Sequence, residues 1–169
     1  MMNASRCVVA GVGMAILSFL FPASAHQLLT PKGSNVSHYH YEEFSEATVA
    51  AMDAEIAEKY PYAVKWRSAS AIYNCHSYAW ADENCWVPDP WIYVSDGSSS
   101  SDPSGPMRTW GDIASHSAIH SAIKSSGTIC GYGTCVSKWG AYGLYKHADA
   151  AGHHPYGGSH THSYTVPNP

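Results

Sequence analysis

The chain of 169 residues has the length of one ordinary domain, carries a formal net charge of −4 and holds few charged side chains, at 13%. It has no basic stripe, which argues against nucleic acid as a partner, and its mild acidity gives no attraction to anionic surfaces. Its 12 tyrosines and six tryptophans suit an extracellular domain with an aromatic-lined groove, although core packing accounts for them equally well.

Residues 1–25 have the pattern of a secretory signal peptide. Arg6 supplies a positive charge, residues 7–21 are uncharged and mostly apolar, and Pro22-Ala23-Ser24-Ala25 offers an Ala-x-Ala cleavage signal. The apolar run is shorter than the roughly 20 residues that a transmembrane helix needs. We therefore expect a secreted or periplasmic protein with no integral membrane segment after processing, and a single domain over residues 26–169.

Two helices are predicted in the first half of that domain. Val49, Met52 and Ile56 recur at helical spacing, and Ser45 can cap a helix that continues to about Lys59. A second helix is predicted from Cys75 to about residue 82, after an extended approach over residues 62–73. Residues 86–91 read as an aromatic loop, and the Ser/Gly/Pro-rich residues 95–106 as a surface connection.

The second half of the chain is strand-like. The expected strands and turns, in chain order, are 111–113, 116–119, 120–123, a turn at Gly127, a hairpin of 128–130 with 135–139, and 143–147. The tail is rich in His and Gly and shows no periodicity. This order predicts an α+β fold, with N-terminal helices packed on an antiparallel sheet.

Four cysteines follow the predicted signal peptide, and in an oxidising compartment they could form two disulfides in any of three connectivities. The segment Cys130-Gly-Tyr-Gly-Thr-Cys135 reads as a hairpin whose flanking cysteines face each other, so we pair Cys130 with Cys135. Cys75 and Cys85 then remain. They either bridge each other, or Cys75 is a reactive thiol and Cys85 a buried one.

The tripeptide Asn74-Cys75-His76 is the most informative feature of the chain. A cysteine directly after a helix-capping residue lies where unpaired backbone amides favour a thiolate. About forty residues later the duplicated tetrapeptide His-Ser-Ala-Ile begins at His116 and again at His120, and either histidine could act as a base. We interpret His76 as a packing or surface residue that points away from Cys75.

Several of these segments together resemble the papain-like fold of the NlpC/P60 and CHAP cell-wall hydrolases. The segments are Asn74–Tyr78, Gly111-Asp112-Ile113, His120–Gly127 and Ser137–His147, within roughly residues 70–147. The resemblance implies a papain-like domain with its core at about residues 42–147, a nucleophile at Cys75 and a base at His120. His116 remains the alternative base, because the duplicated tetrapeptide fits either register.

The resemblance also implies a third catalytic residue on the strand that follows the base, where this chain offers Ser137, which orients an imidazole only weakly. The expected activity is that of a secreted cysteine peptidase or amidase. It would cleave an amide bond through a thioester intermediate, in peptidoglycan peptides or other peptides. We expect a monomer that needs no cofactor.

Two other functions remain open. One is a non-catalytic secreted domain that is stapled by Cys75–Cys85 and Cys130–Cys135 and binds a surface ligand through its aromatic residues. The other is a metal-binding protein that uses the tail histidines. No acidic residue or cysteine accompanies those histidines at ligand spacing, so we expect no metal site.

Overall fold

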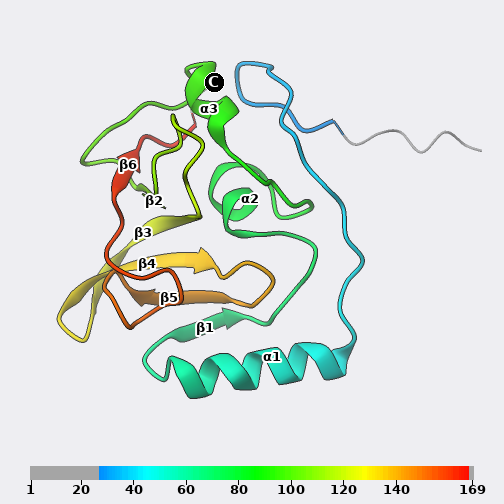
Figure 1. Cartoon of the computed structure of the whole chain (residues 1–169), viewed down its shortest axis with the longest axis vertical. Helices are drawn as coiled ribbons and strands as arrows, with labels where there is room; N and C mark the ends of the chain where they lie inside the picture. Colours follow the sequence, from blue (N-terminus) through cyan, green and yellow to red (C-terminus); the bar gives the residue numbers. More distant parts are fainter. Residues whose placement is uncertain (1–26, 168–169) are drawn as a thin grey trace, which may run out of the picture.

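The computed structural model describes residues 27–167, which form a mixed α/β fold of a few helices on a six-stranded antiparallel sheet (Figure 1). The elements, in chain order, are α1 (Glu46–Lys59), β1 (Val64–Arg67), α2 (Cys75–Trp80), α3 (Trp91–Ser95), β2 (Met107–Trp110), β3 (His120–Ile129), β4 (Tyr132–Lys138), β5 (Leu144–Ala148) and β6 (His162–Tyr164). The predicted signal peptide lies outside the described residues. Within residues 27–167, no helix is both long and apolar enough to span a membrane.

Both predicted helices of the first half are present, and each begins at the predicted cap. The Ser45 side chain accepts a hydrogen bond from the Thr48 amide at the start of α1, and Tyr60 follows the last residue of this helix. Asn74 caps α2 through a reciprocal capping box with Ser77. The helix ends at Trp80, two residues earlier than expected, so Cys75 is the first residue of a short helix.

The strands follow the order β1-β5-β4-β3-β2-β6, and every neighbouring pair is antiparallel. The four strands from β2 to β5 are consecutive neighbours, which confirms the predicted antiparallel meander. β1 and β6 form the two edges of the sheet. β6 comes from the tail, where the sequence shows no strand pattern, and it is held by backbone pairing with β2.

Side chains alternate along each strand, so the sheet has two distinct faces. The α2 face carries Ser121, whose hydroxyl hydrogen-bonds both His76 and Trp80 of α2. It also carries the strand residues of the main apolar core, which are Met107, Ile123 and Tyr164. The opposite face, here called the loop face, carries Trp110, His120, Ala122, Cys135, Ser137, Trp139, Tyr145 and His147.

Two segments cover the loop face. Ile56 and Tyr60, from the C-terminal end of α1, pack against Trp139 and Tyr145. The chain after β5, drawn in orange to red in Figure 1, loops back before it enters β6, and Tyr156 of this segment packs on the sheet. The tail is therefore part of the folded domain.

The β3–β4 hairpin differs from its prediction. The chain reverses at Cys130 and Gly131, which both have positive φ, while Gly127 lies at a register shift within β3. The residue pair nearest the turn is Ile129 with Tyr132, and Cys135 follows Tyr132 by three residues along β4. At the rise of a β-strand, the Cys135 Cα therefore lies about 10 Å from the turn. A disulfide needs Cα atoms within about 7 Å, so the hairpin does not bring Cys130 and Cys135 face to face.

Three further segments differ from expectation. Residues 116–119 form no strand, because the chain turns over Ile113–His116 and enters β3 only at His120. The strand that precedes β3 is β2, and Gly111 begins the turn after it, with a φ of 98°. α3 was not predicted. It is a short helix in an aromatic stretch between two prolines and a polar loop, and its Tyr93 is buried in the main core.

Candidate functional site

Cys75 is held at the start of α2 by the buried side chain of Asn74. The Asn74 Oδ1 atom accepts hydrogen bonds from the amides of Ser77 (3.0 Å) and Val87 (3.2 Å), and its Nδ2 atom donates to the Val87 carbonyl (2.7 Å). One side chain therefore both caps the helix and ties it to the segment before α3. These hydrogen bonds fix the position of Cys75 even though α2 has only six residues.

The thiol of Cys75 is buried against the beginning of β3. The backbone amide of Ser121 donates a hydrogen bond that favours the thiolate, but burial outweighs it and raises the pKa of Cys75 to about 11. The expectation of an easily formed thiolate is therefore wrong for this arrangement. The helix that was expected to favour negative charge has only six residues, and water does not reach the sulfur.

His120 is the first residue of β3 and is fully buried on the loop face. Its imidazole stacks on the Tyr156 ring, with centroids 3.6 Å apart and planes 11° apart, and it lies 4.9 Å from the Trp110 ring. Among the described residues neither ring nitrogen has a hydrogen-bond partner. Burial also lowers the pKa of His120 well below its usual value, so the ring is neutral.

An unpartnered buried polar atom costs about 1–3 kcal/mol, and such groups are rare in native proteins. His120 presents two of them in one side chain. Structural histidines in a core normally bond a carbonyl or hydroxyl, as His76 and His147 do here. His120 therefore differs from the other buried histidines in a way that core packing does not explain.

The structure brings Cys75 and His120 to the same end of β3. The Ser121 amide, which bonds the Cys75 sulfur, directly follows His120 in the chain. Tyr156, which stacks on His120, also interacts electrostatically with Cys75. No hydrogen bond joins the Cys75 thiol to the His120 ring, so the two groups are neighbours without forming a catalytic pair in this conformation.

The alternative base, His116, is not near the thiol. It lies in the exposed turn before β3, has a φ of 57°, pairs with the Asp89 carboxylate and stacks on Trp91 with centroids 4.9 Å apart. Of the two registers of the duplicated tetrapeptide, that of His120 places a histidine directly before Ser121, whose amide bonds the Cys75 sulfur.

Ser137 does not orient His120. Its hydroxyl bonds His147 Nε2 at 2.8 Å and accepts a hydrogen bond from Trp139 Nε1 at 3.1 Å. His147 in turn donates from Nδ1 to the Ala148 carbonyl, and its ring centroid is 6.5 Å from that of His120. The expected third residue is thus engaged with a different histidine on the same face.

His76 is a packing residue, but it is buried and not on the surface. Its Nδ1 atom lies 2.7 Å from the Ser121 hydroxyl on the α2 face, and burial lowers its pKa to about 4. It fastens α2 to β3 next to the candidate nucleophile. A role as the partner of Cys75 is excluded by this bond to the sheet.

Lys138 is a charged neighbour whose contribution the sequence did not indicate. Its fully buried Nζ donates to the carbonyl oxygens of Ser70, Gly140 and Tyr142, and it lies 4.9 Å from the centre of the Tyr73 ring. It also interacts electrostatically with Cys75, and burial lowers the Lys138 pKa to about 7. Through these bonds Lys138 joins the segment before α2, at Ser70, to the β4–β5 turn, at Gly140 and Tyr142.

All four described cysteines are free, and only Cys130 is exposed. The tail histidines are dispersed. His154 lies near Trp110 and His147, and His160 pairs with Asp149. Among residues 27–167 no three His, Cys, Asp or Glu side chains gather in a way that could hold a metal ion.

Tyr156 is the residue of this site that sequence reasoning missed. It lies in a Gly- and His-rich segment without periodicity, which composition alone assigns to an irregular tail. A hint is present in the sequence: a single Tyr between Pro155 and two glycines is an anchor of the kind that holds a compact loop on a core.

Comparisons of the chain with protein-family models, with curated proteins and with solved structures found no match.

Proposed function

We propose that the protein is a cysteine hydrolase with a papain-like arrangement, in which a helix that begins with Cys75 packs on an antiparallel sheet that carries His120. One observation carries the proposal: the Cys75 sulfur lies against the backbone of Ser121, the residue after His120. The second observation is His120 itself, a buried neutral imidazole with both nitrogens unpartnered. A neutral imidazole is the form that accepts a proton from a thiol.

The proposed reaction cleaves an amide. His120 takes the Cys75 proton, the thiolate attacks the carbonyl carbon to form a C–S bond, and the C–N bond breaks as the imidazolium returns its proton to the leaving amine. Water then attacks the thioester and gives its proton to His120, which passes it to the departing thiolate. The products are a carboxylic acid, an amine and the free thiol, so neither oxidant nor cofactor enters.

The proposed substrate is a peptidoglycan peptide or another peptide, met outside the cytoplasm by a monomeric protein. The signal-peptide pattern of residues 1–25 and the resemblance to cell-wall hydrolases support this choice. The low charge of the chain is compatible with it, since a peptide amide needs no strong counter-charge for recognition.

The experiment is a hydrolysis assay on purified peptidoglycan and on peptides, with release of new amino groups as the readout. The assay uses two parent proteins, the wild type and Tyr156→Ala, in which the ring stacked on His120 is removed. Each parent is compared with its Cys75→Ser variant. We expect Cys75→Ser to abolish release and the matched change Cys85→Ser, at another buried cysteine, to retain it. Release that survives Cys75→Ser, or no release by either parent, would overturn the proposal.

A second candidate function is supported by a separate apolar pocket. Tyr41, Phe44, Ala71, Trp86 and Ala141 line a pocket of about 230 Å³ with almost no polar surface. A non-catalytic domain could bind an apolar or aromatic group of a surface ligand there. If this is the function, Trp86→Ala removes binding to peptidoglycan in a pull-down assay while Cys75→Ser leaves binding unchanged.

A further inference from the structure

The candidate site is closed by the chain between β5 and β6, here called the 149–160 loop. The ends of this loop are fastened together, because the His160 amide donates to Asp149 Oδ1 at 2.8 Å and the two side chains form an ion pair. A short loop with joined ends is an Ω-loop, a type that is frequently functional. The Trp110 indole adds a hydrogen bond to the Gly158 carbonyl at 3.1 Å.

The middle of the loop is held differently from its ends. Within the described chain, residues 150–157 form their hydrogen bonds inside the loop, from the His153 amide to the Ala150 carbonyl and from the Tyr156 amide to His154 Nδ1. The contact with the sheet is made by the Tyr156 ring, through stacking on His120 and packing at Trp110, Trp139 and Tyr145. Directly above His120 the loop is therefore held by stacking and apolar contact, and its hydrogen bond to the sheet from the Trp110 indole lies nearer its end, at Gly158.

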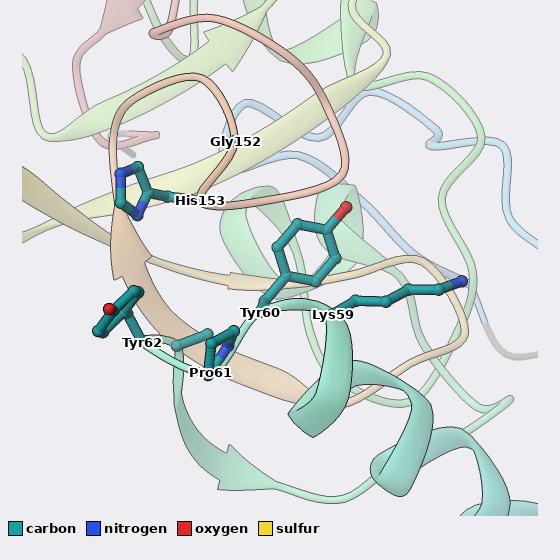
Figure 2. A pocket seen from close by; sticks show the side chains of 7 residues that line it. Lys59, Tyr60, Pro61, Tyr62, Gly152 and His153 are labelled. Carbon is teal, nitrogen blue, oxygen red and sulfur yellow. The ribbon is translucent and has the colours of Figure 1, made fainter.

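Open space lies on both sides of the loop. A pocket of about 250 Å³ lies between the loop and the end of α1, and the His153 and Tyr62 ring centroids at its edge are 6.3 Å apart. Figure 2 shows His153 of the loop facing Tyr60 and Tyr62 across this pocket. A second pocket, of about 270 Å³, is lined by Trp110, Ile119 and residues 156–159. Each flank of the loop therefore borders a pocket.

Both candidate reactive groups, the Cys75 thiol and the His120 imidazole, are buried, and the loop covers the imidazole. A peptide reaches neither the Cys75 sulfur nor the His120 ring in the closed conformation, because both are buried and Tyr156 lies flat on the imidazole. The same stacking holds the imidazole where neither nitrogen finds a partner. Closure thus blocks access to the site while both imidazole nitrogens are unpartnered.

We propose that the 149–160 loop is an autoinhibitory lid: its Tyr156 ring occupies the space over His120 where a peptide substrate docks, and the site opens when the loop moves aside. The claim that the lid controls hydrolysis rests on the proposed function. The claim that the lid opens does not rest on it, because exposure of the Cys75 thiol can be measured whether or not the protein hydrolyses a substrate.

The test is the rate of iodoacetamide alkylation of each cysteine in the reduced full chain, followed by peptide mass spectrometry. Exposed Cys130 is the internal reference for reagent activity, and Cys85, which is buried outside the loop face, reports global unfolding. We expect Tyr156→Ala to accelerate alkylation of Cys75 at least tenfold while Cys85 keeps its wild-type rate. Asp149→Asn, which weakens the joined ends of the loop, changes the Cys75 rate in the same direction.

The matched control is Tyr39→Ala, because Tyr39 is exposed and lies in the N-terminal segment, paired with Trp86. It leaves the Cys75 rate unchanged. The lid proposal is overturned if Cys75 in Tyr156→Ala is alkylated at the wild-type rate. It is also overturned if the Cys75 rate rises only by the same factor as the Cys85 rate, because that would report global unfolding. Faster Cys75 alkylation without hydrolysis by any variant would retain the lid and remove the hydrolase, whereas hydrolysis with an unchanged Cys75 rate would do the reverse.

Discussion

Tyr156 lies flat on the imidazole of His120, with ring centroids 3.6 Å apart, and, besides burial, ionisation of Cys75 would raise the pKa of the Tyr156 hydroxyl. One tail residue therefore contacts the candidate base and is electrostatically coupled to the candidate nucleophile. In this closed arrangement burial keeps the thiol protonated and the imidazole neutral, so neither member of the pair carries a charge. Under the proposed function, these are the protonation states from which the thiol would give its proton to the imidazole.

The buried histidines predict a loss of stability in mild acid. Burial lowers the pKa of His76 and of His147 to about 4, and it lowers that of His120 as well. Since the unfolded chain takes up protons near pH 6.5, these groups stabilise the fold fully above that pH, and their contribution falls as the pH drops towards 4. For His76 and His147, a shift from about 6.5 to about 4 corresponds to about 3 kcal/mol each over this range.

We therefore expect the melting temperature to fall steeply between pH 6.5 and 4.5, in a range above most carboxylate titrations. Calorimetry at closely spaced pH values measures this. His76→Gln, which has no titrating group, should show a shallower dependence than the wild type. A melting temperature that is equal at pH 7 and pH 4.5 contradicts the prediction.

Lys138→Met should destabilise the protein strongly. The ammonium donates to three backbone carbonyls from two separate segments, and its removal leaves those carbonyls buried with fewer partners. Each buried acceptor that is left without a partner costs about 1–3 kcal/mol. Lys59→Met is the matched control, because Lys59 is 60% exposed and makes only one surface ion pair with Glu55, so it should change stability by less than about 1 kcal/mol. Urea denaturation compares the two variants, and equal midpoints would show that Lys138 has no such role.

The sequence predicted those parts of the fold that depend on local signals. Ser45 and Asn74 mark the starts of their helices because capping is a contact within a few residues. The strands from β2 to β5 form the expected meander for a similar reason, since each is joined to the next by a connection without another strand or helix. β6 was missed because its three residues become a strand only through pairing with distant β2.

The candidate site was predicted in its residue types but not in its state. Cys75 and His120 lie at the same end of β3, whereas the low thiol pKa expected for Cys75 does not occur, because burial depends on what covers the sulfur. The tail also contributes a residue to the site that the sequence did not indicate, because Tyr156, in a segment without periodicity, stacks on His120. Similarly, Ser137 is paired with His147 through strand register, which residue identity alone does not reveal.

Asn74→Ala should cost more than the loss of an ordinary helix cap. Its side chain makes the cap and also two hydrogen bonds with the Val87 backbone, all of them buried. We expect a loss of about 2–4 kcal/mol, compared with about 1 kcal/mol for Ser45→Ala at the exposed cap of α1. Chemical denaturation of both variants provides the comparison, and a smaller effect at Asn74 than at Ser45 would show that the Val87 contacts contribute nothing.

Cys130 should react between molecules and not with Cys135. It is exposed in the β3–β4 turn, while Cys135 is buried on the loop face about 10 Å further along the hairpin. With a mild thiol oxidant such as diamide, we expect disulfide-linked dimers on non-reducing gels, and Cys130→Ser should remain monomeric. Cys85→Ser serves as the control and should still dimerise, because its thiol is buried in the wild type and takes no part. Recovery of a peptide that links Cys130 to Cys135 would show that the hairpin rearranges in solution, since the observed strand register keeps the two sulfur atoms apart.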